Sequence, residues 1–266
     1  MLTNYHTHTN FCDGKDSAED VVKVAIEKGF SALGFSGHGF TSFDQSYCMK
    51  SISDYVTEVN RLKEKYKGKI QIYLGIEEDS FELVNRKDYD YVLGSSHYVK
   101  THKGILPIDL SHEHFKALLE AFKGNHIELA KAYFESFVDY LLKRKPDIVG
   151  HFDLITKYDE KDGLVFLNDT SYNQLAEKYL LQALKCQCIF EVNTGAIARV
   201  YRTSPYPALN LLYLMSKNDA KIMINTDCHN KENLDCFVKE SKLLLKDVGF
   251  EYTYVLYDGE FKKDYL

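Results

Sequence analysis

Short runs of hydrophobic residues alternate along the chain with longer segments in which hydrophobic positions recur every three or four residues. The short runs predict buried strands and the longer segments predict amphipathic helices, because side chains repeat their direction every two residues in a strand and every 3.6 in a helix. The predicted strands are 2–7, 32–36, 69–76, 89–95, 147–150, 188–192, 221–225 and 252–257. The predicted helices are 17–28, 52–67, 126–145, 170–184, 205–216 and 231–247.

The first helix has clear start and stop signals. Ser17 is a favoured N-cap residue, and Asp20 three positions later makes a short version of the capping box. Gly29 predicts the end of this helix, because glycine readily adopts the left-handed conformation that follows many helices.

Strands that alternate with helices are typical of βαβ units and a parallel sheet. We find no linker and no low-complexity segment, so we expect a single domain over residues 1–266, a length that suits one α/β barrel. Two connections, 39–51 and 99–125, are longer than the others, and the second is interpreted as an insertion with little periodicity. Long connections in a compact domain are often functional.

Metal-capable side chains lie at the predicted carboxyl end of each of the first seven strands. In a barrel these ends converge on one mouth, which is where barrel enzymes carry out their chemistry. Residues scattered over a surface would not be expected to show this regularity. The residues are His6, His8, His38, Glu77, His97, His151, Glu191, Asn193, Asp227 and His229.

The spacing of two pairs adds a second argument for a barrel. His6 and His8, like Asp227 and His229, are two positions apart, so both members of each pair point to the same face of an extended chain. The pairs belong to the first strand and to the last strand before the tail. These strands become neighbours only if the sheet closes, so a shared metal site favours a barrel over an open sheet.

Imidazoles mixed with carboxylates suit zinc, iron or manganese, and suit calcium poorly. Six histidines, with Glu77, Asp227 and Asp13, exceed the four ligands that one zinc ion takes. The sequence therefore predicts two or three divalent metal ions, with a carboxylate available to bridge them. Neighbouring metal ions are typical of phosphoester hydrolysis, where they bind phosphoryl oxygens and lower the pKa of a bound water.

Some nearby residues have simpler explanations. His102 and His126 fit surface or capping positions and are assigned no role. His112 and His114 lie near a helix start, where capping or solvation is favoured over substrate contact.

The assignments of Glu77, His151 and Asp153 depend on the neighbouring residues in the sequence. Glu78 and Asp79 follow Glu77 directly, so the choice among these carboxylates stays open. The context Gly-His-Phe-Asp favours His151 as a ligand, with Asp153 as a candidate hydrogen-bond partner.

Two of the five arginines, Arg199 and Arg202, follow the sixth predicted strand and should lie near the mouth. The planar fork of an arginine matches phosphate oxygens, so we expect Arg199 to bind a substrate phosphate, with Arg202 as the second candidate. A pair of surface residues flanking a helix is the alternative interpretation.

Composition narrows the class of protein. The formal net charge of −6 argues against a dedicated nucleic-acid binder. The longest hydrophobic run, 209–215, is too short to span a membrane, and the start lacks a secretory signal pattern. The six cysteines show no C-x-x-C spacing, so we expect reduced thiols and a cytoplasmic protein.

These residues together resemble the polymerase and histidinol phosphatase (PHP) family of metal-dependent phosphoesterases. The resemblance covers most of the chain, and its opening looks especially like the stand-alone histidinol-phosphate phosphatases. It implies a distorted seven-stranded, TIM-like (βα)7 barrel. It is carried by His6-Thr7-His8-Thr9-Asn10-Phe11-Cys12-Asp13-Gly14, Gly37-His38, Gly75-Ile76-Glu77, Gly94-Ser95-Ser96-His97, Gly150-His151-Phe152-Asp153, Glu191-Val192-Asn193-Thr194 and Asn225-Thr226-Asp227-Cys228-His229.

The resemblance also implies three metal sites. The first would use His6, His8, Glu77 and Asp227; the second Glu77, His97 and His151; the third Asp13, His38 and His229. Many relatives have histidine where this chain has Asp13.

The expected activity is hydrolysis of a small phosphomonoester, L-histidinol phosphate, in histidine biosynthesis. Glu77, Asp227 and His229 are the expected catalytic residues. The proton donor to the leaving alcohol stays open among Asp153, a metal-bound water and a nearby histidine. Candidates for reading the imidazole and amine of the substrate are Glu78, Asp79, Asp44 and the insertion 99–125. The alternatives are a nucleotide or oligonucleotide exonuclease with the same site, and a metal-binding regulatory protein or signalling phosphatase. Metal-dependent amidohydrolysis ranks low, because no lysine at a strand end matches the carboxylated lysine that such sites usually contain.

Overall fold

The computed structural model describes residues 1–163 and 165–266. Seven strands form a parallel sheet in the order β1-β2-β3-β4-β7-β8-β9, and each hydrogen-bonded pair runs parallel. The strands are β1 (Thr3–Asn4), β2 (Ala32–Phe35), β3 (Gln71–Asp79), β4 (Tyr91–Ser95), β7 (Ile148–Val149), β8 (Ile189–Asn193) and β9 (Ile222–Asn225).

The two edge strands, β1 and β9, approach one another just beyond their carboxyl ends. Thr7 and Cys228 form a parallel bridge, in which the N–H of His8 donates to the carbonyl of Cys228 at 2.8 Å. The N–H of Cys228 donates in turn to the carbonyl of His6 at 3.0 Å. The sheet is therefore a nearly closed barrel, as the two spaced pairs predict.

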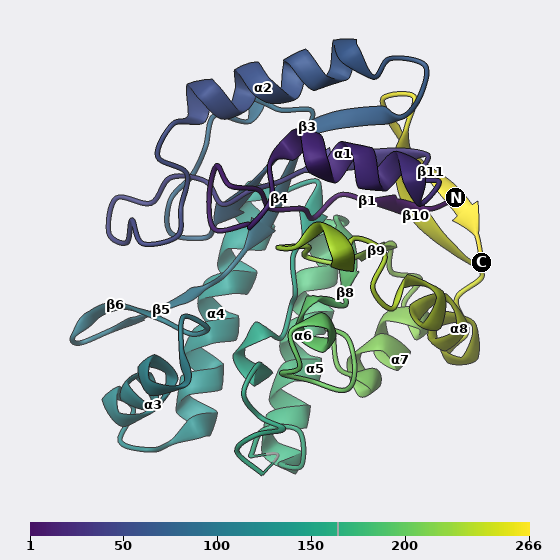
Figure 1. Cartoon of the computed structure of the whole chain (residues 1–266). Helices are drawn as coiled ribbons and strands as arrows, with labels where there is room; N and C mark the ends of the chain where they lie inside the picture. The colour runs from purple at the N-terminus through teal and green to yellow at the C-terminus, as the bar shows by residue number, and fades with distance from the viewer. Residues whose placement is uncertain (164) are drawn as a thin grey trace.

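Helices surround this sheet and bury their hydrophobic faces against it (Figure 1). In the first helix, the N–H of Asp20 donates to Oγ of Ser17 and Gly29 has a φ of +77°, so both predicted end signals are confirmed. The main helices are α1 (Ala18–Glu27), α2 (Ile52–Lys65), α4 (His126–Arg144), α5 (Thr170–Ala183), α7 (Leu209–Lys217) and α8 (Val238–Val248).

The insertion after β4 has more structure than its sequence predicts. It contains the hairpin β5 (Tyr98–Thr101) and β6 (Gly104–Pro107), followed by α3 (His112–Ala121). Such short elements give too few hydrophobic repeats to be recognised, and here burial of Phe115 and Leu118 against the main core stabilises the helix. The hairpin lies beside α4, and α3 contacts β6 (Figure 1).

Two predicted helices begin later than expected. The helix predicted at 205–216 begins at Leu209, because Tyr206 instead exchanges backbone hydrogen bonds with Asn193 at 2.8 and 3.0 Å. A short helix, α6 (Gly195–Ala198), precedes this turn and was not predicted. The helix predicted at 231–247 starts as a 3-10 turn and becomes α8 only after Phe237, whose φ is +57°.

A hairpin of β10 (Tyr252–Tyr257) and β11 (Glu260–Tyr265) covers the barrel end opposite the mouth. Val255 and Leu256 join the residues that fill the barrel interior, and the hydroxyl of Tyr5 donates to the carbonyl of Leu256 at 2.6 Å. The sequence predicts β10 but not β11. Both chain ends lie beside this hairpin (Figure 1), leaving the other mouth free for a site.

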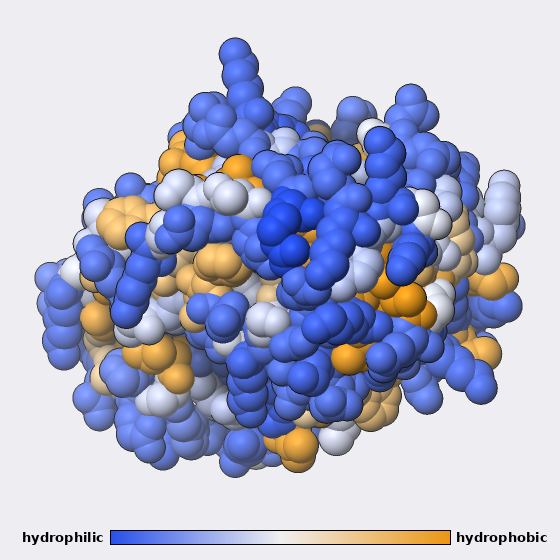
Figure 2. Space-filling view, turned by 45° about the horizontal axis from the view of Figure 1, so that its top comes forward, coloured by the Kyte–Doolittle hydropathy of each residue, from blue (hydrophilic) through white to orange (hydrophobic). Residues whose placement is uncertain are grey.

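The outside of the molecule is mainly polar on the face shown in Figure 2, where hydrophobic residues occur in small, scattered groups. Among the described residues, none of the helices combines the length and the hydrophobicity needed to cross a membrane.

Candidate metal centre at the barrel mouth

The structure brings all nine predicted metal ligands together at the carboxyl ends of the strands. Their donor atoms form four overlapping groups, and within each group the atoms lie within 4.8 Å of one another. The groups are His8, Asp13, His38 and His229; His6, Glu77 and His151; His6, His8 and Asp227; and His38, Glu77 and His97. The grouping differs in part from the three predicted sets, because His6, His8 and His38 each belong to two groups.

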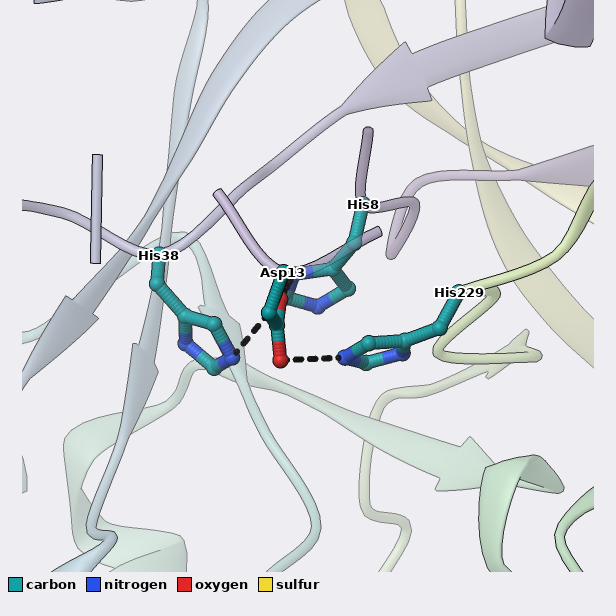
Figure 3. Close-up of side chains that lie close together, drawn as sticks. All are labelled: His8, Asp13, His38 and His229. Carbon is teal, nitrogen blue, oxygen red and sulfur yellow. Dashed lines mark hydrogen bonds and ion pairs between the residues drawn. The ribbon is translucent and has the colours of Figure 1, made fainter. Parts of the chain in front are cut away.

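Figure 3 shows the group that contains Asp13. Its carboxylate lies between the imidazoles of His38 and His229, with Oδ2 at 3.2 Å from Nε2 of His229 and Oδ1 at 3.7 Å from Nε2 of His38. Nδ1 of His8 lies 3.5 Å from Oδ1, and the rings of His8 and His229 stack at 4.0 Å. The aspartate thus occupies a position from which it could share an ion with three histidines.

Glu77 lies at the centre of the cluster and presents its two carboxylate oxygens to different imidazoles. Oε2 lies 3.3 Å from Nε2 of His6 and 2.9 Å from Nδ1 of His38. Oε1 lies 3.3 Å from Nε2 of both His97 and His151. A carboxylate with this arrangement can bridge two metal ions.

Three buried atoms at this centre form no hydrogen bond with any described residue: Nε2 of His6, Nε2 of His8 and Oε2 of Glu77. Nε2 of His8 lies 3.5 Å from Oε2 of Glu77 and 3.2 Å from Oδ1 of Asp227. Ligand bonds of roughly 2.1 Å to one tetrahedral ion place two ligand atoms roughly 3.4 Å apart. Buried polar atoms are rarely left without partners, so these residues fit a divalent cation.

The electrostatics of the cluster also favour cations. Burial alone would lower the pKa of the His6 imidazole, but nearby carboxylates, Glu191 and Glu77 foremost, raise it to about 10. Burial likewise opposes ionisation of Glu77, yet the surrounding imidazoles hold its pKa well below the usual range. His229 differs, because burial, together with charge on His8 and Arg199, lowers its pKa to about 4.

Two carboxylates that were given no role orient the imidazoles of the cluster. Glu191 lies 2.9 Å from Nδ1 of His6 and accepts the backbone N–H of His151 at 2.7 Å. Asp79 lies 3.2 Å from Nδ1 of His97 and accepts its backbone N–H at 3.0 Å. Contacts of this kind fix which ring nitrogen faces a metal. The sequence names Glu191 among the strand-end candidates and Asp79 among the alternatives to Glu77, but it does not show which imidazole each one contacts.

The two predicted phosphate-binding arginines have different environments. Nη2 of Arg199 lies 2.7 Å from Oδ2 of Asp227, and the side chain lines the cavity at the mouth. Arg202 is only 3% exposed and lies outside the cavity lining, where its guanidinium donates to Thr156 and Ser204. Its burial and its place outside the cavity lining make Arg202 a weaker candidate than Arg199 for binding a substrate phosphate.

Asp153 is also outside the cavity lining. It is fully buried, its Oδ2 accepts the backbone N–H of Ala208 at 3.0 Å, and the same oxygen lies 3.8 Å from Nη1 of Arg202. Burial raises the pKa of this carboxyl. No hydrogen bond joins it to His151: Oδ1 of Asp153 and Nδ1 of His151 both lack a partner among the described residues. Its burial argues against direct contact with a leaving group, and its role as a proton donor stays a prediction.

The cavity at the mouth has a volume of about 200 Å³. One part of its lining comes from the candidate metal ligands together with Arg199. The insertion contributes Tyr98, Pro107, Asp109 and Leu110, and the remaining lining includes Tyr47, Lys157 and Tyr201. None of these last residues was singled out from the sequence, because their approach to the mouth depends on how the insertion and loops fold.

Comparisons with known proteins agree with this architecture. A Schizosaccharomyces pombe protein named "Probable histidinol-phosphatase" is 31% identical over 274 residues, which cover 94% of this chain and 87% of that protein. The crystal structure of a Listeria monocytogenes protein superposes with a TM-score of 0.78 at 21% identity, covering 90% of this chain and 99% of the other.

A second crystal structure, of the histidinol phosphate phosphatase from Lactococcus lactis with zinc, L-histidinol and phosphate, has a TM-score of 0.70 at 18% identity. The match covers 98% of both chains. The model of the family described as the PHP domain matches residues 4–195. This chain belongs to the PHP domain family.

Proposed function

We propose that this protein is a metal-dependent phosphomonoesterase that hydrolyses L-histidinol phosphate to L-histidinol and phosphate, a reaction of histidine biosynthesis. The observation that carries the proposal is the cluster of nine ligand-type residues, six of which line one cavity, with buried donor atoms that form no hydrogen bond with described residues. The names of the S. pombe relative and of the L. lactis structure support this choice of substrate.

Two or three divalent ions, zinc, manganese or iron, are proposed to occupy the cluster. Glu77 is the proposed bridging ligand, because its two oxygens face different imidazoles. Bound ions of this kind would supply Lewis acidity and an activated water for attack on phosphorus. The proposed ligands are His6, His8, Glu77 and Asp227 for one ion, Glu77, His97 and His151 for a second, and Asp13, His38 and His229 for a third.

Arg199 is proposed to bind the substrate phosphate. Its Nη2 is held by Asp227, and its Nη1 lies 2.8 Å from Nδ1 of His229, so the guanidinium is fixed beside the cluster. Its Nε forms no hydrogen bond with any described residue although it is buried. The side chain as a whole is 29% exposed and lines the cavity, so a phosphate oxygen there can reach its accessible part.

A small substrate is favoured over a nucleic acid. The net charge is −6, and the insertion contributes part of the lining of a cavity of about 200 Å³. A reducing compartment such as the cytoplasm is the proposed location, because all six cysteines are free thiols.

Phosphate release by the zinc- or manganese-loaded protein tests the substrate. We expect kcat/KM for L-histidinol phosphate to exceed that for p-nitrophenyl phosphate by a large factor, with no release of nucleotides from short single-stranded DNA. Equal rates on both small esters would contradict the assigned substrate, and rapid DNA hydrolysis would favour the exonuclease alternative.

A further inference from the structure

One carboxylate in the cavity belongs neither to the candidate metal ligands nor to their hydrogen-bond partners. Three aspartates line the cavity, and two of them, Asp13 and Asp227, contact imidazoles of the cluster. The third, Asp109, comes from the insertion, between the end of β6 and the start of α3. Its position is therefore set by the insertion and not by a barrel strand.

Asp109 is held firmly on one side and is free on the other. Nζ of Lys157 donates to its backbone carbonyl at 2.8 Å and to Oδ2 at 3.1 Å, and the hydroxyl of Tyr158 donates to the same carbonyl at 2.9 Å. Lys157 itself lies over the ring of Tyr201, 5.0 Å from its centroid. Oδ1 accepts no hydrogen bond from the described part of the chain, and the side chain is 25% exposed.

The charge of this carboxylate is well defined. Burial would raise the pKa of Asp109, but Lys157 foremost, and then His97 and His151, lower it to about 2. At neutral pH the cavity therefore contains an ionised, partly desolvated carboxylate with one free oxygen. A group of this kind is a good acceptor for a cationic donor on a ligand.

We propose that Asp109 recognises the primary ammonium group of the substrate, and so makes the enzyme selective for phosphomonoesters of amino alcohols. This inference rests on the proposed function, because it assigns the end of the substrate that the metal cluster and Arg199 do not bind. Lys157 is a positioning residue, which occupies Oδ2 and leaves Oδ1 for the ligand. Asp109 itself was not singled out from the sequence; the folded insertion brings it into the cavity lining.

The strength of the interaction sets the expected selectivity. A hydrogen bond to a charged group contributes enough to change affinity by about 10- to 100-fold. A substrate without the amine leaves the Asp109 carboxylate unpaired and partly desolvated, and so loses this contribution. Because the ammonium group lies away from the phosphoryl group, we expect the loss mainly in KM, with little change in kcat.

The test compares L-histidinol phosphate with its deaminated counterpart, 3-(imidazol-4-yl)propyl phosphate. For the wild-type metal-loaded enzyme, we expect kcat/KM to favour the aminated ester by about 10- to 100-fold. In Asp109→Asn this preference should disappear, through a higher KM for the aminated ester alone. Asp162→Asn is the matched control, because Asp162 holds His112 of the insertion at 2.7 Å but does not line the cavity; it should keep the wild-type preference.

The possible failures are distinguishable. Equal wild-type activity on both esters leaves the phosphatase intact and overturns the inference, as does an Asp109→Asn variant that keeps the preference or loses activity on both esters equally. A wild-type enzyme inactive on every phosphomonoester overturns the proposed function as well. Should Asp109→Asn not fold, inhibition of the wild-type enzyme decides: L-histidinol should bind about 10-fold or more tightly than the deaminated alcohol, and equal inhibition overturns the inference.

Discussion

Nε2 of His6 lies 3.3 Å from Oε2 of Glu77, and both atoms are buried without a hydrogen bond to any described residue. His6 lies just after β1 and Glu77 lies near the end of β3, so the two meet only because the barrel brings the carboxyl ends of its strands to one mouth. Two unpartnered, complementary ligand atoms at this distance are best explained by a cation that binds both.

Replacement of a proposed metal ligand at the centre of the cluster should remove most of the activity. We expect Glu77→Gln and His151→Ala to lower kcat for L-histidinol phosphate by about 100-fold or more, because either change removes a ligand from the metal pair. Metal content, measured by plasma mass spectrometry on the same samples, should fall in parallel. His126→Gln is the control, because His126 pairs with Asp169 outside the cavity lining. Near-wild-type rates in both cluster variants would rule out this site.

Metal binding should release protons. The pKa of His6 in the metal-free protein is raised to about 10, chiefly by Glu191 and Glu77 against the effect of burial, so His6 is protonated at neutral pH. An imidazole binds a metal only in its neutral form, so zinc displaces this proton and the apparent affinity rises with pH up to about 10.

Calorimetric titration of zinc in buffers of different ionisation enthalpy measures this release. The observed binding enthalpy should depend on the buffer, with a slope of at least one proton released for each protein. His6→Gln should reduce the slope. An enthalpy independent of the buffer would contradict the predicted protonation of the metal-free cluster.

The two arginines after β8 should fail in different ways when replaced. Arg202→Met leaves the buried carboxylate of Asp153 without its countercharge at 3.8 Å, so we expect a loss of about 3 kcal/mol in the free energy of unfolding. The Asp153→Asn/Arg202→Met double variant should recover part of this loss in urea denaturation. Arg199→Ala should instead raise KM and lower kcat. A strongly inactive but fully stable Arg202→Met protein would contradict these assignments.

Val200 should be replaceable with a gain in stability. It has a φ of +58° and is 80% exposed, an unfavourable conformation for a β-branched residue with few contacts to offset it. Val200→Asn should increase the free energy of unfolding by about 1 kcal/mol, because asparagine tolerates this conformation better. Val200→Ala should give a smaller gain, since alanine keeps a Cβ without favouring the left-handed region. Thermal unfolding of both variants checks the order. A destabilised Val200→Asn protein would show that the valine side chain makes stabilising contacts.

Much of the site was predictable because its information is local. His6 and Glu77 stand where hydrophobic runs end, and parallel strands bring such ends together whatever the details of the connections. The positions of the Asp153 and Arg202 side chains were not predictable in this way. They depend on the pairing of Asn193 with Tyr206, which turns the chain after β8 and buries both side chains.

The insertion shows the same limit. Its strands are four residues long, and its helix has only two fully buried hydrophobic residues, so periodicity gives almost no signal. Asp109 reaches the cavity through contacts with Lys157 and Tyr158, which lie far away in sequence. Long-range contacts of this kind are set by packing and cannot be inferred from spacing alone.

The most direct test of the account is the dependence of phosphate release on metal. The protein is stripped of metal, its metal content is verified, and zinc or manganese is added back in known equivalents with L-histidinol phosphate as substrate. We expect no turnover in the stripped protein and activity that saturates at two or three ions per chain. Full activity in protein verified as metal-free, or saturation at a single ion, would contradict it.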